Sequence, residues 1–365
     1  MFLPAPLPRN LEASFRDLTS EKASTRASAI RDVVRHALRS DATRERAIPQ
    51  LERALRNDDV PAVRAEAAVA LADVAAHEAL PTLLVAVEDD DAHVRQMALS
   101  ALGEIGDVRA IRRLERALRD SRPEVRYQAV IAFARVARDD PAAVVGTVLG
   151  ALDDEDPAIR YIAMRVAEEQ LAAAGTDDAA SADGPLRNDR LIARADQLVD
   201  GPDEAVAVVA ALYLARLGRT RGQAVVLDVV AERRETPELE DEQACVEATG
   251  DLELRDAIAH LERRAWGRRR VLRTLFSWGA GDHASCAWHA RIALARMGHE
   301  RACTEILADL GSWRRETREA AVVAAGRARL HQARATLEKL LSTSTSGESV
   351  DAALVREALV RLGAA

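Results

Sequence analysis

One short phrase recurs at a constant spacing, and this repeat constrains the fold more than any other feature of the chain. A valine-arginine pair returns after 31 residues and then after 31 again, and a looser isoleucine-arginine copy follows 34 residues later. The four copies are Val63-Arg64, Val94-Arg95, Val125-Arg126 and Ile159-Arg160. A constant period of this length is the mark of an internal repeat.

Each pair is followed by small and apolar residues at matching distances. They are Ala67, Ala70 and Leu71 in the first copy, Ala98, Ala101 and Leu102 in the second, and Ala129, Ala132 and Phe133 in the third. Offsets of three, four and seven residues place side chains on one face of a helix. Each pair therefore lies in an amphipathic helix.

A turn rich in acids and prolines precedes each pair, as at 57–59, 89–91, 120–123 and 153–157. Asp, Ser and Pro suit the start of a helix as caps, first-turn residues and partners of its positive end. A second apolar run lies upstream of the turns, as at 79–87 and 110–118. Each repeat is therefore predicted to be a helical hairpin.

Hairpins that cannot bury their own apolar faces alone stack into an α-solenoid. We predict an all-α fold of about nine or ten stacked hairpins. A regular array covers 1–171, a loop or hinge rich in small and polar residues covers 172–189, and a divergent array covers 190–365. In the divergent array Ala207 and Ala287 stand at the arginine position, and Arg318 restores it.

The stretch DDDAHVRQMALSALGEIGDVRAIRRL, residues 89–114, resembles the HEAT-like repeat found in bacterial scaffolds and in phycobilin lyases. The resemblance implies that the turn aspartate and the arginine stack as a ladder that holds neighbouring repeats together. The residues matching this ladder are Asp89, Arg95, Asp120, Arg126, Asp154 and Arg160. The resemblance is specific for the fold and does not identify an activity.

Composition agrees with a core of thin helices. The chain has 365 residues, of which 48% are hydrophobic but only 3% aromatic, so Ala, Leu and Val must fill the interior. The net charge of -8 argues against general nucleic-acid binding, which favours a basic surface. Three cysteines, an odd number, fit a reducing cytoplasm. We expect neither a signal peptide nor a membrane span.

Two tyrosines mark the predicted partner-binding face. Tyr127 and Tyr161 each follow the arginine of their repeat directly, at the position that Gln96 takes one repeat earlier. With Gln128 and Met164 they form a candidate aromatic hot spot on the inner face of the solenoid. Half-exposed packing within the array is the alternative for these residues.

An arginine cluster interleaved with tryptophan is the second candidate site. Guanidinium groups beside aromatic rings bind phosphates, nucleic-acid backbones or acidic proteins. The alternative, which we favour, is a solvated helix face neutralised by the acids at 238–242. The cluster consists of Arg263, Arg264, Trp266, Arg268, Arg269, Arg270 and Arg273.

Metal binding and catalysis find less support. His283, Cys286 and His289 are types that bind zinc, but their spacing spreads them around a helix and the sequence offers no evident fourth ligand. We favour a buried Cys286 with packing or surface histidines, and predict no metal and no cofactor. The chain has no phosphate-binding glycine loop and no Gly-x-Ser-x-Gly motif.

We therefore predict a non-catalytic, cytoplasmic scaffold or adaptor that binds a protein partner on its inner face. One alternative is a nucleic-acid or phosphate binder that uses the arginine cluster. Another is a bilin-lyase-like or other enzyme-accessory role, which the repeat type alone suggests.

Overall fold

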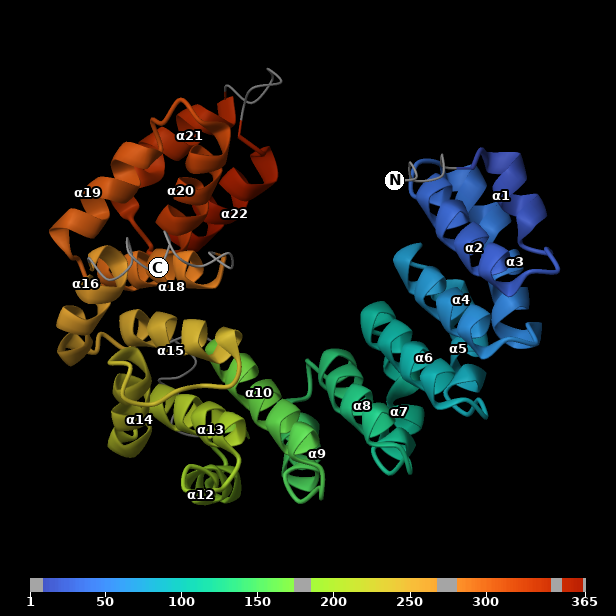
Figure 1. The fold of residues 1–365 in the computed structure, drawn as a ribbon, viewed down its shortest axis with the longest axis horizontal. Coiled ribbons are helices and arrows are strands. Elements are labelled where there is room, and N and C mark those ends of the chain that lie inside the picture. Colours follow the sequence, from blue (N-terminus) through green and yellow to red (C-terminus); the bar gives the residue numbers. More distant parts are fainter. Residues whose placement is uncertain (1–8, 174–184, 268–280, 343–349, 364–365) are drawn as a thin grey trace, which may run out of the picture. The chain divides into compact units, whose positions relative to one another are not determined.

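The computed structural model describes residues 9–173, 185–267, 281–342 and 350–363, apart from the side chains of 281–285. Regular structure in these ranges is entirely helical (Figure 1), with no strand among them. The chain divides into two compact units, Met1–Leu191 (unit 1) and Ile192–Ala365 (unit 2). The prediction of an all-α solenoid of helical hairpins is confirmed.

In unit 1 the helices alternate between two rows. Row A contains α1 (Leu11–Asp17), α3 (Asp41–Asn57), α5 (Leu80–Ala86), α7 (Ile111–Ala117) and α9 (Pro141–Ala151). Row B contains α2 (Ala23–Ala37), α4 (Pro61–Asp73), α6 (Ala92–Ile105), α8 (Pro123–Val136) and α10 (Pro157–Ala173). In Figure 1, α3, α5, α7 and α9 lie on one side of the row-B helices, and α6 packs most closely on α4 and α8.

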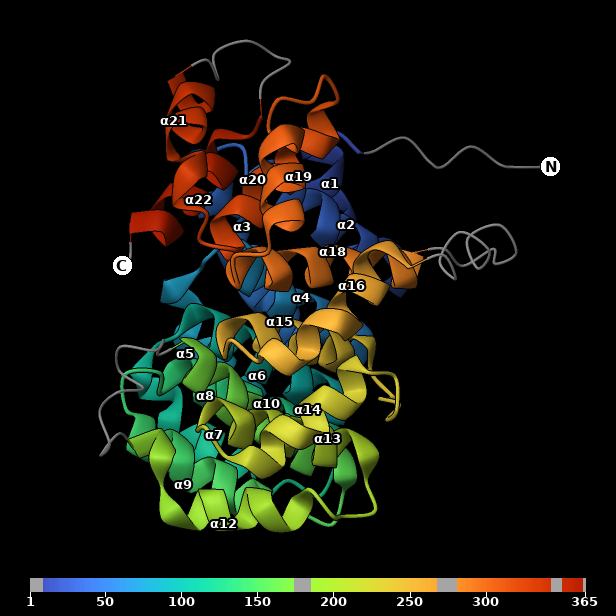
Figure 2. The same cartoon turned by 90° about the vertical axis from the view of Figure 1, so that its left-hand side faces the viewer.

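Unit 2 continues the alternation, and the unit boundary falls within α12. Row A contains α12 (Asp189–Leu198), α14 (Thr220–Val230), α16 (Ile258–Trp266), α19 (Glu300–Asp309) and α21 (Arg334–Ser342). Row B contains α13 (Glu204–Arg216), α15 (Leu239–Asp251), α18 (Gly281–Arg296), α20 (Arg315–Arg327) and α22 (Ala352–Gly363). Figure 2 shows α19, α20 and α22 on the same side of α18.

Short 3-10 helices connect several pairs. They are η1 (His77–Ala79), η2 (Val108–Ala110), η3 (Pro185–Arg187), η4 (Arg255–Ala257) and η5 (His331–Ala333). Counted over the described residues, the helices make ten pairs, five before residue 174 and five after residue 184. Of the predicted hinge at 172–189, residues 174–184 lie outside the described residues.

The predicted helix-start signals lie at the row-B helix starts. Proline occupies the first turn of α4 and α8, where its missing N–H breaks no hydrogen bond. At α6 the carboxylate of Asp91 accepts hydrogen bonds from the backbone N–H groups of His93 and Val94, at 2.9 and 3.2 Å.

A residue in the left-handed region ends most row-B helices. It comes eleven residues after the arginine position, and its φ is positive at Ala75, Gly106, Gly218, Glu253, Gly298 and Arg329. In unit 2 the residues eleven positions before these turns are Ala207, Glu242, Ala287 and Arg318, which therefore occupy the arginine position. The turn thus preserves a common register where the valine-arginine phrase has been lost.

Small residues let neighbouring row-B helices approach closely. The alanine three residues after the arginine position is fully buried in all five repeats of unit 1, at Ala29, Ala67, Ala98, Ala129 and Ala163. In unit 2 a methyl group added to Gly250 would come within 2.7 Å of the Ala293 Cα atom, so that helix contact requires glycine. Among the described helices, none is both long and apolar enough to cross a membrane.

Candidate functional site

A ladder of ion pairs runs along the turn edge of unit 1. The guanidinium groups of four row-B arginines each donate two hydrogen bonds to the carboxylate of an aspartate in the next repeat. The pairs are Arg26–Asp58 (2.6 and 2.7 Å), Arg64–Asp89 (2.9 and 2.7 Å), Arg95–Asp120 (2.9 and 2.9 Å) and Arg126–Asp154 (2.8 and 2.9 Å). Bidentate contacts of this kind fix both the distance between the two side chains and their relative orientation.

Each ladder aspartate also organises its own turn. The carbonyl oxygen of Asp89 accepts a 2.8 Å hydrogen bond from Arg95, and its carboxylate accepts a 2.9 Å bond from the backbone N–H of Asp91. The same arrangement recurs at Asp120 and Asp154, and Arg160 donates to the Asp154 carbonyl at 2.8 Å. The six residues predicted from the resemblance therefore lie in one continuous network.

Electrostatics in the ladder favour the ionised carboxylates. The hydrogen bond from Arg126 holds the pKa of the Asp154 carboxyl below its ordinary value. Burial raises the pKa of Asp89, but hydrogen bonds from Arg64 and from a backbone N–H lower that pKa by more. The arginine side chains are only 11 to 16% exposed, so solvent screens these pairs weakly.

A second set of positions forms the exposed face of row B in unit 1. With the arginine as position zero, positions 2 and 5 of α4, α6, α8 and α10 are half-buried, whereas positions 3 and 4 between them are buried. We call this set the unit 1 stripe; it consists of Glu66, Val69, Met97, Ser100, Gln128, Ile131, Ile162 and Arg165. Its two charged members pair internally, Glu66 with Arg31 at 3.0 Å and Arg165 with Glu169 at 2.9 Å.

The predicted tyrosine site is only partly at this surface. Tyr127, Tyr161 and Gln96 occupy position 1, where they are half-buried at the flank of the stripe, and Gln128 lies in the stripe itself. The prediction that Met164 contributes to a binding face is wrong, because its side chain is 0% exposed. Position 4, which Met164 occupies, is also a core position in the three preceding copies, at Ala68, Leu99 and Val130.

In unit 2 the corresponding face carries a polar network instead. The Asp251 carboxylate in α15 contacts Arg216 of α13 at 3.2 Å and Arg296 of α18 at 2.7 Å. Arg296 also donates a 3.1 Å hydrogen bond to the carbonyl oxygen of Arg327 in α20. One chain of contacts therefore links four consecutive row-B helices.

Glu247 is the second centre of this network. Its carboxylate oxygen lies 2.6 Å from both His289 Nδ1 and Arg327 Nη1. Burial raises the pKa of the Glu247 carboxyl, but His289 and Arg327 lower it more, so the pKa lies below its ordinary value. Arg327 also lies 5.5 Å from the centre of the Trp288 ring. Sequence reasoning missed this network, whose residues occupy positions 2, 5 and 9.

The histidines and cysteine considered for zinc binding have other surroundings. Cys286 is buried at the position of the repeat valine, and His289 is buried against Glu247. The side chain of His283 lies outside the described residues. Within the described part of the chain, His, Cys, Asp and Glu side chains form no group of three or more that suits a metal ion.

Part of the arginine cluster is used inside the protein. Arg264 donates to the carbonyl oxygens of Val230 and Val229 at 2.7 and 2.9 Å, and it also pairs with Glu242. Its side chain is only 7% exposed and therefore not available to an external anion, and its pairing with Glu242 agrees with the neutralisation by the acids at 238–242 that we favoured.

Two other members of the cluster also have partners. The indole nitrogen of Trp266 donates to Glu305 at 3.0 Å, and Arg263 contacts the His260 ring. Arg268, Arg269, Arg270 and Arg273 lie outside the described residues.

Comparison with solved structures finds similar helical folds at low identity. An engineered protein is 20% identical (97% of this chain and 98% of that chain covered, TM-score 0.40). The CpcE–CpcF complex of phycocyanin lyase from Nostoc sp. PCC7120 is 18% identical (71% and 96% covered, TM-score 0.41). Kap95p, in a complex with RanGDP, is 14% identical (96% and 51% covered, TM-score 0.48). No match to a curated protein was found.

The family match falls on the regular array of unit 1. Residues 48–134 match the model of HEAT repeats, and this segment contains the three valine-arginine copies and the ladder pairs Arg64–Asp89 and Arg95–Asp120. The match shows HEAT repeats within residues 48–134, and helix pairs of the same kind continue on either side of this segment.

Proposed function

We propose that this protein is a non-catalytic scaffold that binds a protein partner along the row-B face of unit 1. HEAT-repeat solenoids typically mediate protein binding, because stacking leaves a long continuous surface. The observation that carries the proposal is the uncharged centre of the unit 1 stripe. Its members, Met97 and Ser100 in α6 and Gln128 and Ile131 in α8, are half-buried side chains on adjacent helices.

The surroundings of this centre suit a protein interface. Val69 and Ile162 extend the apolar surface on either side, and Tyr127 flanks it. Protein interfaces combine an apolar centre depleted in charge with a polar rim, and tyrosine is enriched among their strongest contacts. The charged ends of the stripe, Glu66 and Arg165, provide such a rim.

The two alternatives rest on weaker ground. For anion binding, the described members Arg264 and Trp266 are engaged within unit 2, and the net charge of the chain is -8. A bilin-lyase-like or other enzyme-accessory role is supported by the family resemblance alone.

The test is affinity capture of the full chain from its native lysate, at low and high salt and with nuclease in a parallel sample. We expect a defined protein partner to survive both treatments, because the proposed contact is largely apolar. The double variant Met97→Glu/Ile131→Glu should reduce capture by about tenfold or more, since each charge would be desolvated at the interface.

A matched control places the same two charges outside row B, at Val85 in α5 and Val108 in η2. Val85 and Val108 are 65 and 66% exposed, so Val85→Glu/Val108→Glu should leave capture unchanged. Tyr127→Ala/Tyr161→Ala should weaken capture without unfolding the array. Equal capture by all three variants, or recovery of nucleic acid alone, would make the proposal wrong.

A further inference from the structure

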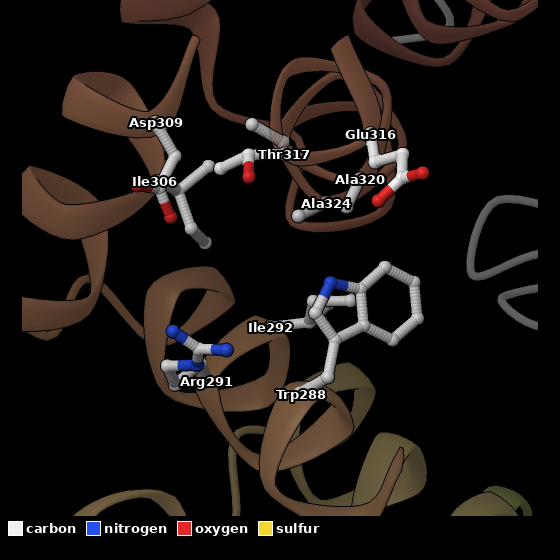
Figure 3. A pocket seen from close by; sticks show the side chains of 10 residues that line it. Trp288, Arg291, Ile292, Ile306, Asp309, Glu316, Thr317, Ala320 and Ala324 are labelled. Carbon is white, nitrogen blue, oxygen red and sulfur yellow. The ribbon is translucent and has the colours of Figure 1, made fainter. Parts of the chain in front are cut away.

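Unit 2 contains an open pocket of about 280 Å³ among α18, α19 and α20 (Figure 3). It forms because α18 packs far more closely on α15 than on α20. On the pocket side α20 presents only small side chains near its middle, namely Ala320, Ala321 and Ala324. The space therefore arises from the helix packing of unit 2 and is distinct from the unit 1 stripe.

An unsatisfied hydrogen-bond donor lies in the wall of this pocket. The Nε atom of Arg291 is buried and has no hydrogen-bond partner among the described residues. Its Nη1 atom is 3.9 Å from Glu305, too far for a hydrogen bond. A buried N–H without an acceptor is unfavourable. The Arg291 side chain as a whole is 29% exposed and lines the pocket, so its terminal nitrogens can reach a ligand there, and a carboxylate is the strongest acceptor for guanidinium.

Two carboxylates lie on the other side of the pocket. Asp309 of α19 and Glu316 of α20 line it across from Arg291 (Figure 3). Neither forms an ion pair with any other residue in the described part of the chain. These groups call for a donor, and an ammonium group supplies one with the complementary charge.

The remaining lining is apolar. The indole ring of Trp288 forms one wall in Figure 3, and Ile292 and Ile306 contribute aliphatic surface. An apolar group bound here would be removed from water on several sides, which favours binding.

We propose that this pocket binds a small zwitterion with an apolar body, namely a free aliphatic or aromatic α-amino acid. The carboxylate would pair with Arg291, the ammonium with Asp309 or Glu316, and the side chain would pack on Trp288. A simple carboxylate would leave Asp309 and Glu316 without a cationic partner, and a simple amine would leave Arg291 without an anionic partner. The volume is slightly below the ~300 Å³ at which pockets for drug-sized ligands begin, as expected for such a ligand.

The test is isothermal titration calorimetry of the full chain with L-phenylalanine and L-leucine. Two analogues isolate the charges: 3-phenylpropionate lacks the amine, and 2-phenylethylamine lacks the carboxylate. We expect saturable binding of at least one amino acid, and binding of both analogues weaker by about tenfold or more, since each loses one charge-assisted contact.

Two variants locate the site. Arg291→Gln should weaken amino-acid binding by about tenfold or more, whereas Arg301→Gln, on the exposed side of α19, should not. Ala320→Phe should block the pocket from an exposed position, with the unfolding temperature as a check on folding. Absence of binding by both amino acids, equal binding of either analogue, or binding that survives both pocket variants would overturn the proposal.

Discussion

Both units contain a row of stacked row-B helices, but the ion pairs that join neighbouring helices lie at different places in the two units. In unit 1, arginines at position zero reach the aspartates of the next turn, so the linking charges lie along the turn edge. In unit 2, three of these positions hold Ala207, Glu242 and Ala287. There the linking charges lie on the row-B face, centred on Asp251 and Glu247.

This difference determines which surfaces of row B take part in joining the repeats. In unit 2 the charged side chains of the row-B face pair with one another across helices and so join neighbouring repeats. In unit 1 the ladder joins the repeats instead, and the row-B face carries uncharged residues such as Met97 and Ile131. Under the proposed function, the ladder leaves the row-B face of unit 1 available to a partner, because it joins the repeats at their turns.

Breaking the ladder should have the largest effect on stability. Arg95→Met keeps the alkyl chain but leaves the Asp120 carboxylate, 15% exposed, without its guanidinium partner. We expect a loss of about 3 kcal/mol in the free energy of unfolding, at the low end for breaking a buried pair. Urea unfolding measures the loss, and amide hydrogen exchange should place it in α6 and α8.

The control is an arginine outside the ladder. Arg109 pairs with Asp107 on the surface and is 68% exposed, so Arg109→Met should change stability little. Equal effects of the two substitutions would mean that the ladder does not hold unit 1 together.

Breaking the unit 2 network should cost less. Glu247→Ala leaves His289 and Arg327 without their shared carboxylate, but Glu247 is 34% exposed and solvent screens part of the loss. We expect about 1 to 2 kcal/mol by urea unfolding. Ser100→Ala, at the same position of the repeat in unit 1, should change stability by less than about 0.5 kcal/mol. Similar losses of stability in the two variants would mean that the row-B face of unit 2 does not join its repeats more strongly than that of unit 1.

Sequence reasoning could predict the fold and the ladder because both depend on local spacing. Arg95 and Asp120 lie 25 residues apart, less than one repeat, and both belong to a phrase repeated several times. Even the error at Met164 was avoidable, since position 4 holds Ala68, Leu99 and Val130 in the earlier copies, all core residues.

The network and the pocket could not be predicted in this way. Glu247 and Arg327 are 80 residues apart and belong to repeats that have lost the valine-arginine phrase. Their contact depends on how α15, α18 and α20 are rotated and spaced, which small residues such as Gly250 determine through close packing. The pocket depends on the loose contact of α18 with α20, which no periodicity in the sequence encodes.

The smallest expected effect is the pH dependence of the ladder, which separates charge from hydrogen bonding. The pKa of Asp154 is lowered in the folded protein, chiefly by the hydrogen bond from Arg126. A lowered folded pKa stabilises above the unfolded value of about 3.9, and this contribution disappears as the pH falls through the folded pKa. Asp154→Asn should therefore cost about 1 kcal/mol at pH 7 and progressively less below about pH 4. Urea unfolding at pH 7, 5 and 3 measures the difference. A difference that stays constant over this range would show that the ladder acts through hydrogen-bond geometry, and that its charges contribute little to joining the repeats.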